Sequence, residues 1–367
     1  MDGGKGARDS DDMRVGVSPS NVTTGPGTKR VRPSALPILI RGRSTIRAMK
    51  ALTFDRFGGP EVLEYREVPD PLPGPGQAIV KTEAIGLNFA DVYRRRGDYH
   101  LEGKPPYIAG YEAAGVIESI AGDSDLRVGD RVGFADAPHA NAERVAVAIE
   151  KLIPLPDDIT AEVAAAVLLQ GLTAQYLVTD SHALRAGETA LVHAAAGGVG
   201  LLLVQMAKAR GVRVLGLTSS PEKARSALQH GADAIALYSE DWPTVAREFS
   251  PGGVDVVYDS AGTTLLDSFA AARTGGHVVF YGMAGGSPPH IDPRMLMDTS
   301  KSLTGGDLWN VLRSGKERRK RASDLFDQVR HGTLRITIAA KIPLRDGARA
   351  HTLLESRGTS GKILLIP

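Results

Sequence analysis

The pattern of hydrophobic and polar positions divides the chain into parts with different rhythms. Residues 49 to about 170 contain short, β-branched, partly alternating runs such as 78–87 and 113–121, separated by turns rich in glycine and proline. This pattern is typical of a β-rich domain. The stretch 160–178 then changes to helical spacing, and Thr160 is a candidate for its N-cap.

From about residue 185, short apolar runs alternate with amphipathic or apolar helices. Strands are predicted at 188–196, 212–220, 232–238, 254–260 and 277–283, and helices at 197–211 and 221–231. Strands and helices in this alternation form βαβ units, which build a parallel sheet. From about residue 305 the hydrophobic pattern no longer follows this alternation. The closing run 362–367 predicts a strand that pairs with the first domain.

Residues 1–48 have a different composition from the rest. They carry nine Lys or Arg and four Asp or Glu, so the remaining chain holds 35 basic and 38 acidic side chains, a balance of −3. A body this close to neutral gives no reason to expect a nucleic-acid-binding surface. The segment 16–34 lacks hydrophobic periodicity, and we expect residues 1–48 to be a disordered extension.

Two alternatives remain for this extension. The basic run after Arg14 is typical of a transit peptide, but four early aspartates argue against one. A start codon assigned too far upstream is the other explanation, with Met49 as the true beginning of the folded protein. A truncation at Met49 that lost folding or activity would contradict this interpretation.

Cysteine is absent from the whole chain. Disulfides, thiolate nucleophiles, iron–sulfur clusters and cysteine-ligated zinc are therefore excluded. No uninterrupted apolar stretch approaches the roughly 18 residues of a membrane-spanning helix. We therefore expect a cytoplasmic protein that does not span a membrane.

A glycine-rich turn lies between a predicted strand and a predicted helix, in the sequence HAAAGGVG. Gly197 and Gly198 would let the backbone approach a pyrophosphate, and Gly200 would let the helix pack closely on the strand. Ala195 replaces the first glycine of the dinucleotide pattern, which is tolerable if its φ stays negative. The alternative is a structural turn that binds no dinucleotide.

The end of the second predicted strand indicates which dinucleotide binds. An NAD site needs a carboxylate about 20 residues beyond the glycines, but Ser219 stands there and Glu222 is the first acid after it. The hydroxyl of Ser219 and the ammonium of Lys223 suit a 2′-phosphate, so NADPH is favoured. Alternatively, Lys223 is an ordinary solvated helix residue.

Several further segments carry a family resemblance, including FGGPEVL, AIGLNFADVYRRRGDY, LLQGLTAQYL, VVYDSAG and LLESRGTSGKILLIP. Together with the glycine-rich turn they make residues 49–367 resemble the zinc-free quinone oxidoreductase (zeta-crystallin-like) branch of the medium-chain dehydrogenase/reductases. The resemblance implies an α/β fold in which a Rossmann domain (171–305) is inserted into a GroES-like β-rich catalytic domain (49–170 and 306–367).

The resemblance also implies the positions that surround the cofactor. Near the 2′-phosphate it places Ser219, Lys223, Tyr238 and Arg357; near the pyrophosphate, Gly198 and Val199; and along the rest of the cofactor, Thr173, Ser260 and Gly282. It further implies a homodimer, which nothing in the residues themselves indicates.

Zinc-dependent relatives carry a cysteine and a histidine as metal ligands at two motif positions that hold Asn88 and Tyr111 here. Neither is a good zinc ligand, so no metal is expected. Without a Lewis acid, reduction of activated acceptors is favoured over alcohol oxidation. We therefore expect hydride transfer from NADPH to a quinone or a conjugated carbonyl compound.

The candidate hydrogen-bond donors to the developing oxyanion are Asn88, Tyr93 and Tyr99. Each tyrosine could equally be a packed aromatic residue. Tyr111 and the segment 139–145 depart from the family pattern and are expected to reshape the substrate pocket. The alternative functions are an enoyl reductase that acts on a thioester or an enone, and a non-catalytic NADPH-binding protein.

One basic cluster needs a separate interpretation. Residues 313–321 read RSGKERRKR, which could be mistaken for a nucleic-acid-binding patch. Their spacing predicts a helix after the Rossmann domain, with a solvated or dimer-facing surface. No nucleic acid, membrane or macromolecular partner other than a second copy is expected.

Overall fold

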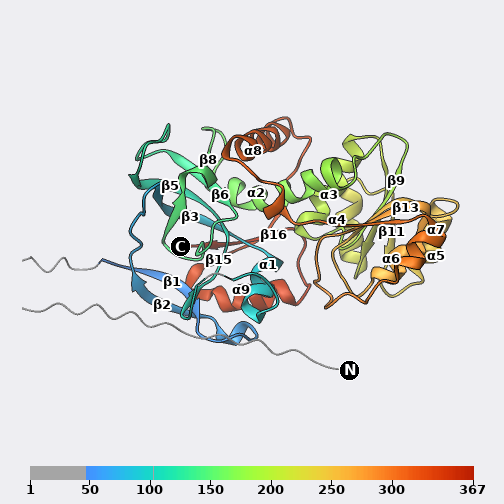
Figure 1. Ribbon diagram of the computed structural model, residues 1–367, viewed down its shortest axis with the longest axis horizontal. Coiled ribbons are helices and arrows are strands. Elements are labelled where there is room, and N and C mark those ends of the chain that lie inside the picture. The colour runs from blue at the N-terminus through green and yellow to red at the C-terminus, as the bar shows by residue number, and fades with distance from the viewer. Residues whose placement is uncertain (1–46, 102) are drawn as a thin grey trace, which may run out of the picture. The chain divides into compact units, whose positions relative to one another are not determined.

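The computed structural model describes residues 47–101 and 103–367 (Figure 1). The predictions for the N-terminal extension therefore lie outside the described residues, apart from its last two positions. The first strand, β1, spans Ala48–Phe54, and the Met49 side chain within it is buried.

The β-rich part contains a seven-stranded sheet assembled from both ends of the chain. The strands follow the order β15-β16-β3-β5-β6-β8, and β7 also pairs with β3. Their bounds are β3 (Gln77–Leu87), β5 (Glu112–Ala121), β6 (Arg131–Ala135), β7 (Arg144–Ala148), β8 (Ile153–Pro154), β15 (Ile338–Pro343) and β16 (Lys362–Ile366). The last strand, β16, pairs antiparallel with β3, which confirms the predicted return of the C-terminus to the first domain.

A smaller sheet and short helices complete this part. The sheet has the order β2-β1-β4, with β2 at Glu64–Pro69 and β4 at Tyr107–Ile108. The helices are α1 (Phe89–Arg96), α8 (Gly315–Arg330) and α9 (Gly347–Glu355), with the 3-10 turns η1 (Pro60–Val62), η2 (Ile149–Lys151), η4 (Leu308–Asn310) and η5 (Leu344–Asp346).

The middle of the chain forms a six-stranded sheet of order β11-β10-β9-β12-β13-β14, in which every neighbouring pair is parallel. The strands are β9 (Thr189–Val192), β10 (Arg213–Thr218), β11 (Ala234–Leu237), β12 (Val254–Asp259), β13 (Ala272–Phe280) and β14 (Ser302–Gly305). The crossover helices are α3 (Gly198–Ala209), α4 (Pro221–Gln229), α5 (Trp242–Phe249), α6 (Leu265–Ala271) and α7 (Pro293–Thr299).

This strand order is that of a doubly wound Rossmann sheet and confirms the predicted fold class. The order reverses between β9 and β12, and ligands of such sheets bind at the carboxyl ends of the strands beside that point. The exact boundaries of the three domain segments stay predictions. The predicted boundary between residues 170 and 171 falls inside the helix α2 (Ala161–Tyr176).

The predicted helix 160–178 is observed as α2, followed by a π-helical turn over Leu177–Ser181. The Thr160 hydroxyl accepts a hydrogen bond from the Val163 N–H, which confirms the N-cap. By length and mean hydropathy Ala161–Ser181 is sufficient to cross a membrane, although Gln170, Thr173 and Gln175 interrupt its apolar run. However, 83% of its apolar window is buried, which is the environment of a core helix.

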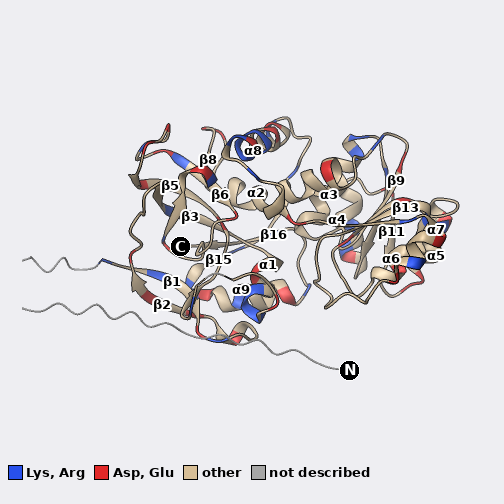
Figure 2. Ribbon diagram, viewed as in Figure 1, with Lys and Arg blue, Asp and Glu red and all other residues tan. Residues whose placement is uncertain are grey.

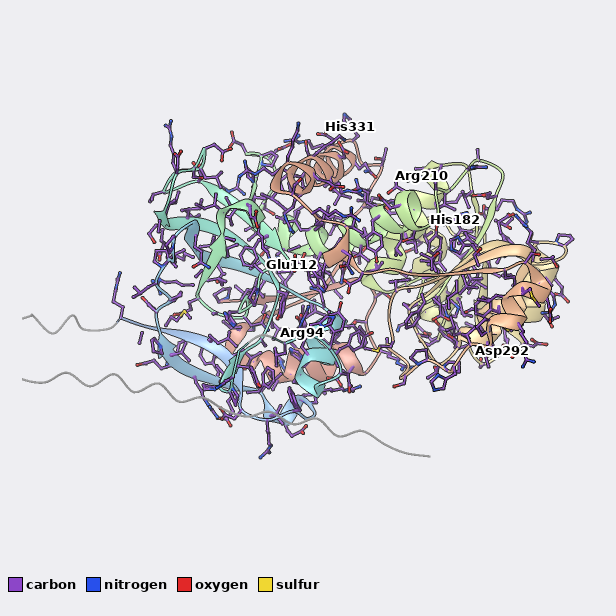
Figure 3. The ribbon with its side chains drawn as sticks, in the orientation of Figure 1. Arg94, Glu112, His182, Arg210, Asp292 and His331 are labelled. Atoms are coloured by element: carbon purple, nitrogen blue, oxygen red, sulfur yellow. The ribbon has the colours of Figure 1, made fainter. Side chains whose placement is uncertain are left out.

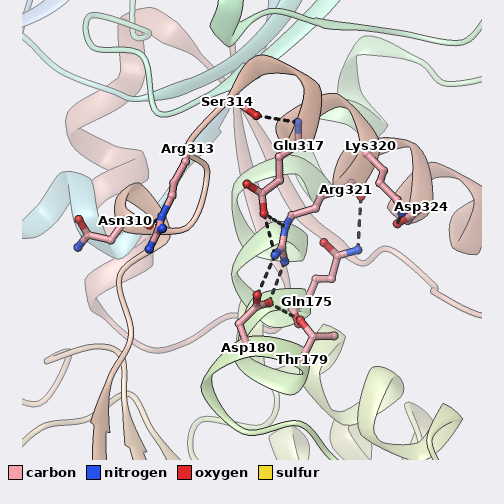
Figure 4. A network of polar contacts seen from close by, with 10 residues as sticks. All are labelled: Gln175, Thr179, Asp180, Asn310, Arg313, Ser314, Glu317, Lys320, Arg321 and Asp324. Atoms are coloured by element: carbon pink, nitrogen blue, oxygen red, sulfur yellow. Dashed lines mark hydrogen bonds and ion pairs between the residues drawn. The ribbon is translucent and has the colours of Figure 1, made fainter.

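The basic cluster at 313–321 lies mainly on α8, as predicted, and two of its arginines are engaged within the chain. Arg318 is 4% exposed and donates to the Ala135 carbonyl. Arg321 forms a bidentate pair with Asp180 at the end of the π-helical turn (Figure 4). Acidic and basic positions are interspersed across the described chain (Figure 2).

Candidate active site

A cavity of about 470 Å³ lies at the carboxyl ends of the parallel strands and extends to the β-rich part. All the residues predicted for the site line this one cavity. They are Asn88, Tyr93, Tyr99, Thr173, Gly197, Gly198, Val199, Gly200, Ser219, Lys223, Tyr238, Ser260, Gly282 and Arg357. The fold therefore brings the whole predicted set together, whereas the role of each residue remains a proposal.

The glycine-rich turn leaves no room for side chains at two positions. A Cβ atom on Gly200 would overlap the carbonyl oxygen of Ala194, and one on Gly198 would overlap the side-chain amide of Gln170. The residue of the turn with left-handed backbone conformation is Ala194, with φ 46°. Ala195 does not have a positive φ, which is the condition under which alanine can replace the first glycine of the pattern. The backbone at the α3 N-terminus is consequently open to an anion.

Two cations converge at the end of the cavity formed by β10 and α4. Burial lowers the pKa of Lys223, and the nearby charge of Arg357 lowers it further. Within residues 47–101 and 103–367, neither cation has a carboxylate within ion-pair distance, and Arg357 donates to the Ala284 carbonyl at 3.1 Å. Ser219 lines the same end. An anion bound here would relieve the repulsion between the two cations.

The Tyr238 hydroxyl is held by a buried polar chain that the sequence did not reveal. It accepts from the Ala194 N–H at 3.1 Å and lies 3.1 Å from Nδ1 of His193. Nε2 of His193 lies 3.1 Å from the Ser268 hydroxyl, which donates to Asp259 at 2.7 Å. Burial lowers the pKa of His193. A neutral imidazole protonated on Nε2 satisfies every group in this chain.

The Asn88 side chain belongs to a buried polar cluster at the cavity wall. Its amide nitrogen donates to the Gly86 carbonyl at 3.2 Å and to Glu112 at 2.9 Å. Its oxygen accepts from Lys362 at 2.8 Å and from Gln170 at 3.2 Å. Both amide hydrogens are therefore already used inside the protein, which disfavours the predicted role of Asn88 as an oxyanion donor and favours a structural one.

The same cluster decides whether the site suits zinc. At the two positions that correspond to metal ligands, Asn88 accepts from the ammonium of Lys362, and the Tyr111 ring packs under the guanidinium of Arg94 at 3.4 Å. A divalent cation beside Asn88 would face the positive charge of Lys362. These residues do not fit a zinc ion.

The two tyrosines are placed differently. The Tyr93 hydroxyl accepts from the Met283 N–H at 3.1 Å, and burial raises its pKa to about 12. The Tyr99 hydroxyl donates to Asp307 at 2.7 Å, and burial together with that carboxylate raises its pKa. The rings lie 6.4 Å apart, edge to face. Tyr93 thus has a proton to donate, whereas the Tyr99 proton is already bound to Asp307.

The remaining predicted positions shape the middle of the cavity. The Thr173 hydroxyl donates back to the Leu169 carbonyl at 2.7 Å, which leaves its oxygen as an acceptor. Gly282 passes close to Ser260, where a Cβ would press on the Ser260 backbone. The predicted pocket-shaping residue Tyr111 does not line the cavity, nor does 139–145, so their expected effect is at most indirect. Tyr111 contacts the lining residue Trp309, with ring centroids 6.0 Å apart.

Sequence reasoning missed several lining residues that come from apolar or loop segments. They are Phe89, Leu169, Gln170, Tyr176, Tyr281, Asp307, Trp309, Leu354 and Ile363. Asp307 and Trp309 lie in a segment without regular periodicity. Their position directly after the Rossmann domain is the one sequence signal that could have indicated that they line the cavity.

A Rossmann sheet with a glycine-rich turn, inserted into a β-rich domain and sharing one cavity with it, defines a two-domain dinucleotide-dependent class of oxidoreductase. Two family models match: the alcohol dehydrogenase GroES-like domain over residues 74–186 and the zinc-binding dehydrogenase over residues 198–327.

Individual proteins narrow this assignment. A quinone oxidoreductase of Pseudomonas aeruginosa is 43% identical over 87% of this chain and 99% of its own length. A 2-haloacrylate reductase of Burkholderia sp is 38% identical over 86% of this chain and 98% of its own length. The crystal structure of Escherichia coli quinone oxidoreductase complexed with NADPH superposes with a TM-score of 0.83 at 35% identity, over 87% of this chain and all of that chain. The chain belongs to the quinone oxidoreductase family of the medium-chain dehydrogenase/reductases and is an oxidoreductase.

Proposed function

We propose that this protein reduces a quinone or a conjugated carbonyl compound with NADPH, without a zinc ion. The observation that carries the proposal is the cavity that joins a glycine-rich turn and the cationic end at Lys223 and Arg357 to a wall rich in tyrosine. The related Escherichia coli enzyme was crystallised with NADPH, which supports the same cofactor here.

The cationic end would select the phosphorylated cofactor. Lys223 and Arg357 would bind the 2′-phosphate, with Ser219 as a hydrogen-bond donor. Tyr238 would line the site beside them, because its proton is already bound to His193. Gly198 and the following N–H groups at the start of α3 would hold the pyrophosphate. When bound, NADPH supplies the hydride for the reduction.

At the acceptor end, the protein would align the substrate and stabilise the charge that develops on its oxygen. Tyr93 is the favoured donor, since its pKa of about 12 keeps it protonated while its hydroxyl oxygen is fixed by the Met283 N–H. Asn88 would act indirectly by holding Gln170, whose side chain lies against Gly198 of the cofactor turn. Tyr99 would act through Asp307.

An enoyl reductase that acts on an enone or an acyl thioester is the second candidate. The 38% identical 2-haloacrylate reductase favours it, because that name denotes reduction of a conjugated C=C bond. A non-catalytic NADPH-binding protein is the third. Stopped-flow oxidation of NADPH with 1,2- and 1,4-quinones, enones and crotonyl thioesters, run beside NADH, distinguishes the three candidates.

A pair of variants tests the cofactor assignment. Lys223→Ala should raise the KM for NADPH by about 10-fold to 100-fold and leave that for NADH nearly unchanged, since one charge-assisted bond to the phosphate is lost. Arg225→Ala is the matched control, because Arg225 lies on the same helix and is exposed. Equal losses for both cofactors, or a wild-type preference for NADH, would contradict the proposal.

The assembly and location follow from the family alone. We propose a homodimer in the cytoplasm, with a small-molecule acceptor as the only other partner. Light scattering on the purified full chain checks the assembly. The protein concentration should be varied upward from below about 1 μM, which is the range of typical dimer affinities. A monomer throughout this range would contradict it.

A further inference from the structure

One carboxylate lies at the acceptor end of the cavity. Asp307 lines the cavity in the loop between β14 and η4. Its Oδ2 accepts from the Tyr99 hydroxyl at 2.7 Å, and its Oδ1 accepts from the Trp309 N–H at 3.1 Å. Both donors are neutral, so they orient the carboxylate without cancelling its charge.

Asp307 has no cationic ion-pair partner among the described residues, since no Lys, Arg or His nitrogen there is within ion-pair distance of this carboxylate. Arg94 stacks on Tyr99 with its guanidinium 5.0 Å from the ring centroid, but it is paired with Asp91, at 3.7 Å. The Asp307 charge therefore acts on whatever occupies the cavity beside Tyr99.

The rest of this end is aromatic and uncharged. Phe89, Tyr93, Tyr176 and Trp309 line it, and burial raises the pKa of Tyr93 and Tyr176, which keeps both neutral. Such a wall favours flat, uncharged acceptors. A carboxylate on the acceptor would face the Asp307 charge, and no Lys, Arg or His among the described residues lines this end of the cavity to offset it.

We propose that Asp307 determines acceptor specificity by excluding anionic conjugated acceptors, such as α,β-unsaturated carboxylates, and admitting neutral ones. This inference rests on the proposed reductase function. It separates this chain from the 38% identical relative, whose name denotes a substrate that is a carboxylate. Two charges of the same sign a few ångströms apart in a partly dry cavity give at least about a 10-fold discrimination.

The test uses two acceptors that differ in charge at nearly constant shape, 2-chloroacrylate and 2-chloroacrylamide, with NADPH oxidation as the readout. The wild-type protein should reduce the amide with at least about 10-fold higher kcat/KM than the acid. Asp307→Asn should raise the ratio of kcat/KM for the acid to kcat/KM for the amide by a similar factor, because this ratio cancels any effect that the two acceptors share. The amide oxygen of Asn retains the acceptor for the Trp309 N–H, and its NH2 group replaces the oxygen that accepts from Tyr99, so the Tyr99 hydroxyl turns to accept that bond.

Further variants exclude a folding artefact. Asp307→Ser removes the charge with a different N-capping side chain, and Asp307→Glu retains the charge; only Ser should relax the discrimination. Asp292→Asn is the control, because Asp292 caps α7 far from Arg94 and Glu112 (Figure 3). It should leave both acceptors unchanged.

The outcomes separate this inference from the proposed function. Reduction of the amide together with an acid-to-amide ratio that stays unchanged in Asp307→Asn and Asp307→Ser overturns the role of Asp307 and leaves the reductase function intact. Equal reduction of both acceptors by the wild type does the same. Absence of NADPH oxidation with these acceptors and with every quinone overturns the proposed function itself.

Discussion

The ammonium of Lys362 lies 2.6 Å from the carboxylate of Glu112, and both side chains are almost completely buried, at 2% and 0% exposure. Lys362 begins the last strand and Glu112 begins β5, so this ion pair joins the C-terminal strand to the middle of the catalytic sheet. Asn88 bridges the two charges.

Lys362→Met should lower the free energy of unfolding by about 3–5 kcal/mol, because it leaves the Glu112 carboxylate buried without its counter-charge. The double variant Lys362→Met/Glu112→Gln should recover most of this loss. Urea unfolding followed by circular dichroism measures both. A single variant that costs less than about 1 kcal/mol would show that the pair is not coupled as described.

Gly200→Ala should abolish tight NADPH binding, since its Cβ would force the turn away from the Ala194 carbonyl. Isothermal calorimetry measures the effect. Gly305→Ala is the control, because an added Cβ there meets no atom within 4 Å. Equal affinities of the two variants would contradict the proposed fit between α3 and β9.

Asp91 should make the stability depend on pH. Burial raises its pKa to about 6, whereas in the unfolded chain it titrates near 4. Between these values the folded state holds the extra proton, so the free energy of unfolding falls as pH rises from about 4 to about 6, by up to about 3 kcal/mol. Above pH 6 this contribution stays constant.

The difference in unfolding free energy between the wild type and Asp91→Asn isolates this titration, since other groups titrate alike in both proteins. That difference should decline across pH 4–6. A flat difference, or one that rises with pH, would mean that the Arg94 charge and the Asn88 N–H compensate the burial of Asp91 fully.

Two arginines of α8 should differ in their contribution to stability. Arg318→Met removes a buried guanidinium that donates to two carbonyls and lies 3.6 Å from Asp136, and it should cost several kcal/mol. Arg321→Met removes a partly exposed pair with Asp180 (Figure 4), which should cost about 1 kcal/mol or less. Thermal unfolding compares them, and equal losses would contradict this ranking.

Asn88→Ala and Tyr99→Phe should each lower turnover by about 10-fold to 100-fold, because both side chains position other groups and do not supply an essential proton. Steady-state NADPH oxidation with a quinone checks this. A loss beyond about 10,000-fold in either variant would identify an acid–base role.

The fold was largely predictable from the sequence because the Rossmann part repeats a strong signal. The predicted strands at 188–196 and 254–260 are predominantly apolar, which is typical of strands that are buried on both faces of a parallel sheet. β13 was harder: it begins at Ala272, within a polar, glycine-containing stretch that shows no strand pattern, and it ends at Phe280, three residues before the predicted limit.

The site was predictable only where residues act through local spacing or a family motif. The glycine turn and Lys223 belong to this group. The partners of Asn88 and Tyr238 do not, because Lys362 and His193 are brought to them from distant parts of the chain, and a buried lysine or histidine looks like any other in a sequence. Long-range contacts of this kind are fixed by tertiary packing alone.

The position of β16 constrains the order in which the two parts of the protein can fold. β16 lies between β15 and β3, and Gly361 before it pairs with Gly197 of the cofactor turn. All strands of the parallel sheet are synthesised well before the C-terminus. In contrast, one edge of β3 has no pairing strand until the last residues, which form β16, leave the ribosome. During translation, the nucleotide-binding half can therefore mature first and act as the platform on which the other half closes.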